Sequence, residues 1–216
     1  MKSIVFFMCY TFLIGCNGQN NMLADSNKNA SYLKYKKEFD YTFISHFPKN
    51  IASKDYSIIC NTNIDKNDVG LILYSYNLTH EVVDSIIHSI KDIDIIGEYN
   101  SEDSCLIVVN RFETYSSQQN YSQPAINDSA KINKNCYKNH YPIPNFIDYV
   151  NPDSSLEIKL DKSFEIYVLD ARSGKYFEKY DLHPAIQMPE NWKNGYSKGI
   201  AISKHENTII YWSIIW

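Results

Sequence analysis

The stretch from Gly195 to Gly199 reads Gly-Tyr-Ser-Lys-Gly and has the G-x-S-x-G spacing of a nucleophilic serine. Such a serine works where a strand enters a sharp turn and a helix leaves it, which exposes the hydroxyl. Here a loop containing prolines and asparagines precedes Ser197, and an apolar strand follows from Ile200. The triad order also fails, because only His205 follows the serine and no acid stands between them. The pattern therefore predicts a glycine-bounded loop that feeds a strand.

A second group, His80, Asp84 and His88, is spaced four residues apart on a predicted helix over 80–91. At 100° per residue these side chains share one stripe, and imidazole and carboxylate groups can bind a metal ion. The same stripe carries Lys91 and lies opposite the apolar side of the helix. An ordinary solvated helix face explains this pattern, so we predict no metal and no cofactor.

Three cysteines beyond residue 16, namely Cys60, Cys105 and Cys136, allow one disulfide at most and leave one thiol over. The sequence leaves the pairing open. A nucleophilic cysteine needs a lowered thiol pKa and a histidine partner in space, and no pattern here indicates either. We expect these residues to be structural, and we assign no catalytic residue.

Residues 113–140 form a polar tract rich in Gln, Asn, Ser and Tyr. A loop of this length inside a compact domain is uncommon unless it has a function or is disordered. Its Asp128-Ser129-Ala130 sequence resembles the acceptor of a bacterial O-glycosylation system, which makes Ser129 a candidate glycosylation site. Tyrosine with Asn and Ser is also typical of adaptable binding surfaces, although tyrosines equally serve core packing.

The chain opens with Met1-Lys2-Ser3, runs apolar from Ile4 to Ile14, and reaches Leu13-Ile14-Gly15-Cys16. A positive start, an apolar stretch and small residues at the cut site are the features of a secretory signal. The apolar run of 11 residues is too short to cross about 30 Å of hydrocarbon. A cysteine after the small residue makes the segment resemble a bacterial lipoprotein signal. The resemblance implies cleavage after Gly15 and lipidation of Cys16.

This interpretation divides the sequence into three segments: a signal peptide at 1–15, a lipidated cysteine with a flexible tether at 16–30, and one folded domain at 31–216. Two or more acyl chains anchor a protein stably, so we expect attachment to a membrane through lipid on Cys16. We place the protein in the bacterial cell envelope, at the outer membrane, and leave the face open. The formal net charge of −4 argues against a nucleic-acid partner.

The predicted fold is a single α+β domain, with a mostly antiparallel sheet of about five to seven strands and helices on one face. The helices are expected at 31–46, stopped by Pro48, and at 80–91 behind Thr79. In the last strand, apolar residues point both ways, which predicts a strand covered on both faces. A turn is expected over 170–175. The remaining apolar runs predict strands at 56–60, 70–76, 105–109, 156–160, 164–169, 200–203 and 208–216.

Near the C-terminus, Trp192 to Gly199 has the form Trp-x-x-Gly-Tyr-Ser-x-Gly and precedes a predicted hairpin. This resembles a group of uncharacterised bacterial lipoproteins that share the segment over roughly the last 35 residues. The resemblance implies an exported domain and brings no activity, substrate or catalytic residue. We therefore hypothesise a non-enzymatic, lipid-anchored envelope protein that binds a protein or glycan partner. The alternatives are an immunity-type lipoprotein that neutralises a toxin at the envelope, and a serine hydrolase that uses Ser197.

Overall fold

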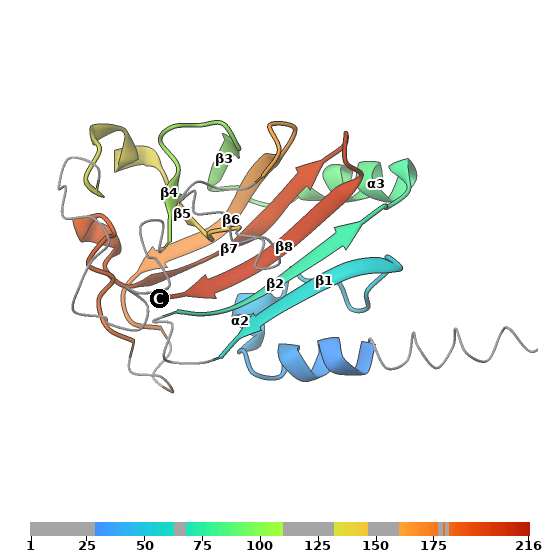
Figure 1. Ribbon diagram of the computed structural model, residues 1–216, viewed down its shortest axis with the longest axis horizontal. Coiled ribbons are helices and arrows are strands. Elements are labelled where there is room, and N and C mark those ends of the chain that lie inside the picture. Colours follow the sequence, from blue (N-terminus) through green and yellow to red (C-terminus); the bar gives the residue numbers. More distant parts are fainter. Residues whose placement is uncertain (1–28, 63–67, 110–131, 147–159, 177–178, 180–181) are drawn as a thin grey trace, which may run out of the picture.

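A computed structural model describes residues 29–62, 68–109, 132–146, 160–176, 179 and 182–216. Its main sheet has six strands in the order β1-β2-β8-β7-β6-β3, and every neighbouring pair is antiparallel (Figure 1). The α+β fold with a mostly antiparallel sheet is therefore confirmed. The strands are β1 (Asp55–Asn61), β2 (Val69–Tyr76), β3 (Gly97–Asn100), β4 (Ile107–Val108), β5 (Pro142–Ile143), β6 (Glu165–Ser173), β7 (Gly195–Ser203) and β8 (Thr208–Ile215).

The last strand, β8, lies between β2 and β7 in the middle of the sheet (Figure 1). All eight of its residues are buried, because both faces of the sheet are covered. This confirms the prediction drawn from its two apolar faces. The strands expected at 56–60 and 70–76 also form, as β1 and β2, and they pair without a register shift, from Asp55 opposite Tyr76 to Asn61 opposite Gly70.

Helices cover one face of the sheet, as predicted. The helix α3 (His80–Ile90) buries Val83 and Ile90 there, and α2 (Tyr41–Ile44) buries Ile44. These side chains share one apolar cluster with the residues of the sheet that face them, among them Leu71, Leu73, Tyr167, Ile200, Ile202, Ile209 and Tyr211. Burial of this apolar surface holds the helical layer on the sheet.

The single helix expected at 31–46 is wrong in its extent. Residues 29–36 are helical, and a separate one-turn helix, α2, follows at Tyr41–Ile44. Asp40 causes the break: its carboxylate accepts a hydrogen bond from the backbone N–H of Thr42 at 2.8 Å and so begins a new helix. The second predicted helix is confirmed within one residue, since α3 ends at Ile90 with Lys91 as its C-cap.

Short strands and 3-10 helices cover the opposite face of the sheet. β4 and β5 form a two-stranded parallel ladder, so the strand expected at 105–109 is reduced to Ile107–Val108. Two short 3-10 helices, η2 (Asn135–Asn139) and η3 (Glu190–Trp192), accompany them. The cluster on this face includes Ile143, Phe146, Phe164 and Trp212. This layer leaves part of the face open.

The turn predicted over 170–175 is wrong, because β6 continues to Ser173 and pairs with β7. A register shift between Val168 and Asp170 marks a bulge. Beyond it Tyr196 donates a hydrogen bond to the Asp170 carboxylate at 2.6 Å, which fixes the two strands side by side. The strand predicted at 156–160 lies outside the described residues except for Leu160.

Candidate functional site

Ser197 lies in the middle of β7, not in a loop that feeds a strand, and its side chain has no exposed surface. Its hydroxyl oxygen has no hydrogen-bond partner among the described residues. The prediction of a loop at 195–199 is therefore wrong, because β7 already begins at Gly195. A nucleophilic serine needs an exposed turn, and this geometry offers none.

The glycines of the same segment have a packing role. A Cβ on Gly199 would meet the Tyr167 carbonyl oxygen and the Trp212 indole, both at distances that real Cβ atoms do not reach. A Cβ on Gly195 would lie 2.7 Å from the Arg172 carbonyl and 3.0 Å from the Trp216 ring. Each glycine lies beside a tryptophan across the β7–β8 ladder, so only a residue without a side chain leaves room for both indoles.

The other predicted site residues do not converge. His80, Asp84 and His88 are exposed on α3, and Asp84 forms an ion pair with Lys204 at 2.7 Å. This is the solvated helix face that the sequence indicated. The lipidation site Cys16 and the candidate glycosylation site Ser129 lie outside the described residues, so both stay predictions.

The structure decides the cysteine pairing that the sequence left open. Cys105 and Cys136 form a disulfide with their Cα atoms 5.8 Å apart, and it joins the loop before β4 to η2. Cys60 is free and half-buried on β1. Burial, with a smaller contribution from Glu38, raises the pKa of its thiol to about 11, which keeps it protonated and unreactive at neutral pH.

Two histidines have structural partners. His46 packs behind the sheet, where its Nε2 donates to the Trp212 carbonyl at 2.9 Å. Part of the residue is accessible, but its ring nitrogens are enclosed, and burial lowers its pKa to about 3. His140 contacts the Asp103 carboxylate at 3.0 Å and stacks on Tyr99 with ring centroids 4.8 Å apart. Both histidines stabilise local packing.

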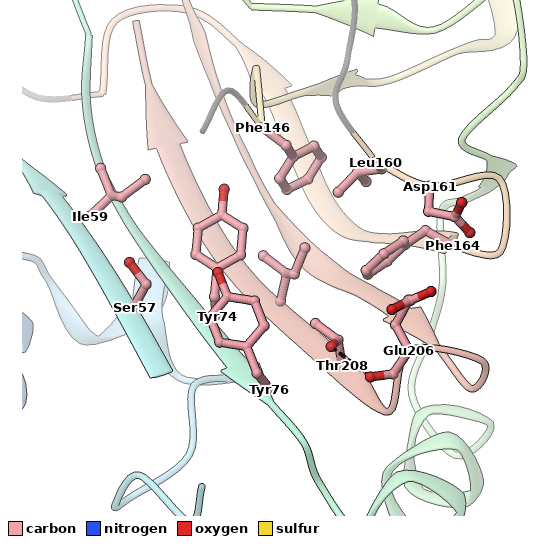
Figure 2. A pocket seen from close by; sticks show the side chains of 11 residues that line it. Ser57, Ile59, Tyr74, Tyr76, Phe146, Leu160, Asp161, Phe164, Glu206 and Thr208 are labelled. Carbon is pink, nitrogen blue, oxygen red and sulfur yellow. Dashed lines mark hydrogen bonds between the residues drawn. The ribbon is translucent and has the colours of Figure 1, made fainter. Parts of the chain in front are cut away.

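The strongest candidate site is an open cleft of about 330 Å³ on the face opposite the helices. Its floor comes from β1, β2 and β8, where the sheet is not covered by β4 and β5. Figure 2 shows the rings of Tyr74 and Tyr76 on one side and Phe146, Leu160 and Phe164 on the other. The remaining lining residues are Ser57, Ile59, Asp161, Glu206, Thr208 and Ile210.

The two tyrosines form an aromatic wall. Tyr74 and Tyr76 are two residues apart on β2, so their side chains point to the same face of the sheet. Their rings are stacked, with centroids 6.0 Å apart and planes inclined by 18°. Stacked tyrosine rings offer a broad, rigid contact surface with few rotatable bonds to be fixed on binding.

Two carboxylates, those of Asp161 and Glu206, lie at one end of the cleft near Phe164 (Figure 2). The side chain and backbone N–H of Ser163 both donate to Asp161, and these bonds lower the pKa of its carboxyl. Asp161 therefore carries a negative charge at neutral pH. Together the lining residues make an apolar, aromatic cleft with an acidic end, which is suited to binding a ligand.

The sequence indicated only part of this site. Alternation along 70–76 places Tyr74 and Tyr76 on one face, and this signal was available. Phe146, Asp161 and Glu206 belong to other segments of the chain, and no local pattern brings them together. The described tyrosines in and beside the polar tract have packing contacts: Tyr137 is buried within it, and Tyr141, just after it, lies edge-on to Trp192 with ring centroids 6.3 Å apart.

Comparisons of the chain with protein-family models, with curated proteins and with solved structures found no match. Among the residues that the structure describes, no helix is both long and apolar enough to cross a membrane. The cleft and its surroundings are therefore the basis for a functional proposal.

Proposed function

We propose that this chain is a lipid-anchored protein of the bacterial cell envelope that binds a protein or glycan partner and catalyses no reaction. The observation that carries the binding role is the open cleft with its stacked tyrosines and acidic end. A cleft lined mainly by apolar and aromatic groups, with a few polar groups, is the usual form of a ligand site.

The anchor is supported by the sequence of residues 1–16, and the Cys105–Cys136 disulfide agrees with export. Disulfides persist in oxidising compartments such as the periplasm and the cell surface. A protein fixed to a membrane through its first mature residue presents its folded domain to partners nearby. Binding through a cleft in that domain fits this arrangement.

The binding role is tested by cross-linked pull-down of the tagged full-length protein from the membranes of its own cells. The test variant is Tyr74→Ala with Tyr76→Ala, which removes the aromatic wall. The matched control is Tyr35→Ala with Tyr41→Ala, because both of these rings are exposed and lie outside the cleft. We expect one dominant partner that the control keeps and the test variant loses.

A partner that the cleft variant retains would contradict the proposal. If no protein is enriched, the same variants are tested on a glycan array, where ring-dependent binding supports the glycan form. Absence of ring-dependent binding in both assays contradicts the proposed function. Enrichment of a secreted toxin alone, in cells exposed to it, would identify the immunity-type alternative.

The anchor has its own test. In Cys16→Ala the lipid cannot be attached, so we expect this variant in the soluble fraction instead of the membrane fraction. The control is Cys60→Ala, since Cys60 is a half-buried residue of β1 with no part in the signal. Membrane retention of Cys16→Ala equal to that of the control would contradict lipid anchoring.

A further inference from the structure

The two carboxylates of the cleft are brought together by the fold. Asp161 and Glu206 belong to different turns, yet their oxygens lie within 4.8 Å of each other and of His205. The hydroxyls of Ser163 and Ser203 are 2.6 Å apart and join the two turns. The backbone N–H of Glu206 also donates to Ser203 at 2.9 Å. The chain therefore holds two like charges close together, where they repel each other unless a cation joins them.

In the described part of the chain, no lysine or arginine forms an ion pair with Asp161 or Glu206. One basic group, His205, lies beside the pair: its Nδ1 is 2.8 Å from Glu206, and its side chain is 78% exposed. The described residues therefore leave the position between the two carboxylates to a cation that a ligand brings.

The walls beside the acidic end favour a ligand with an apolar part. Five lining residues are aliphatic or phenylalanine and offer no hydrogen bond: Ile59, Phe146, Leu160, Phe164 and Ile210. A sugar in this cleft would lose water from its hydroxyls without gaining partners along these walls. An aliphatic stem loses nothing there and buries apolar surface. Tyrosine faces also attract ammonium and guanidinium groups.

The size of the cleft fits a side chain rather than a long oligomer. Its volume of about 330 Å³ is near the lower limit of ligand pockets, which span about 300–1,000 Å³. Lysine and arginine side chains combine an apolar stem with a charged head, and they commonly pack the stem while the head meets a polar group.

We propose that the cleft binds an ammonium or guanidinium group on an aliphatic stem, with the head between Asp161 and Glu206 and the stem against the tyrosine and phenylalanine walls. This inference rests on the proposed binding function and names its ligand class. The lysine or arginine side chain of a partner protein and a free organic amine share this chemistry, and the experiment separates them.

The test is saturation-transfer NMR on the full-length lipidated protein in nanodiscs. The probes are the peptide acetyl-Gly-Lys-Gly-amide, the same peptide with Nε-acetyllysine, n-butylammonium, and N-acetylglucosamine. The test variant is Asp161→Asn with Glu206→Gln. The control is Asp92→Asn with Glu190→Gln, which removes the same charge from exposed positions that do not line the cleft.

We expect the lysine peptide to bind about tenfold more tightly than the acetyllysine peptide, because only the former carries a charged head. The test variant should lose this preference, and the control should keep it. Tighter binding of the peptide than of n-butylammonium assigns the side chain of a protein, and the reverse assigns a free amine.

The inference would be overturned by equal binding of the two peptides, by equal loss in the control, or by binding of N-acetylglucosamine alone. Zn²⁺ or Ca²⁺ binding to Asp161, His205 and Glu206 without any peptide signal would overturn it as well. These results leave the proposed function standing if the tyrosine variant still loses its partner in the pull-down. If the tyrosine variant keeps its partner in the pull-down, the proposed function itself is contradicted.

Discussion

At the residue scale, the most constrained positions of β7 are those that a catalytic interpretation would have singled out. On the face of the sheet that carries Trp212, the residues of β7 are all small: Gly195, Ser197, Gly199, Ala201 and Ser203. Their partners across the ladder include Trp212, Ile210 and Ile214. The small side chains make room for the large ones, which explains the spacing of the two glycines by packing alone.

We predict that Gly199→Ala lowers the free energy of unfolding by about 3 kcal/mol, because the added methyl overpacks the core against the Tyr167 carbonyl and the Trp212 ring. Urea-induced unfolding measures the change. Ser197→Ala on the same strand is the control. It removes a buried hydroxyl that has no partner, so stability should stay the same or rise by about 1 kcal/mol. Equal destabilisation by both changes would contradict the packing explanation.

His46 makes the stability of the fold depend on pH. Burial lowers its pKa in the folded state to about 3, whereas the unfolded chain has the ordinary value of 6.5. Between these values the unfolded state binds the extra proton, so the folded state loses stability as the pH falls. The stabilisation from a neutral His46 is therefore complete above pH 6.5 and is lost progressively toward pH 3.

We expect the free energy of unfolding to fall by up to about 1.4 kcal/mol per pH unit more steeply in the natural protein than in His46→Gln. The window is pH 6.5 down to about 3. Urea titrations of both proteins at several pH values measure the difference between their free energies of unfolding. The effect of the carboxyl groups that both proteins share cancels in this difference. Parallel pH profiles would show that His46 is not held neutral by the fold.

At the element scale, a disulfide fastens the layer that borders the cleft. The short β4–β5 ladder has only two residues in each strand, and such pairs are marginal by themselves. The Cys105–Cys136 bond spans 31 residues and joins the approach to β4 with η2, just before β5. A cross-link of this span restricts the unfolded chain and so compensates for weak strand pairing.

Reduction of this disulfide, or Cys105→Ala with Cys136→Ala, should lower the free energy of unfolding by about 3–4 kcal/mol, the value expected for a loop of 31 residues. Melting curves with and without reductant measure it. Cys60→Ala serves as the matched control and should keep the full response to reductant. A response that persists in the double variant would mean that another group is responsible.

At the scale of the whole molecule, the sheet depends on its last strand. β8 joins β1 and β2 to β7, β6 and β3, and its two faces contribute to both main apolar clusters. Two groups of strands therefore meet only through β8. The cleft also depends on β8, because Thr208 and Ile210 of this strand form part of its floor.

Deletion of residues 209–216 should abolish cooperative folding, because the two halves of the sheet lose their only shared strand and both clusters lose buried side chains. Circular dichroism during heating measures this, with the uncut chain as reference. A truncated protein that still melts in a single sharp transition would contradict the role assigned to β8.

Local patterns predicted much of the fold. Helical spacing identified α3, apolar runs identified β1 and β2, and two apolar faces placed β8 in the centre of the sheet. The predictions failed at two places, one through a local helix cap and one through a contact with another strand. Asp40 begins a new helix within the expected one, and the contact of Tyr196 with Asp170 accompanies the continuation of β6 through an expected turn.

By itself, the sequence determined the fold class, the two-sided burial of the last strand and the expectation of a lipid anchor at Cys16, because each depends on residues that are neighbours in the chain. Tertiary structure alone decided that Cys105 pairs with Cys136, that Ser197 is enclosed, and that Asp161 and Glu206 meet beside a tyrosine wall. These features join segments far apart in the chain, and the packing of the whole domain sets their distances.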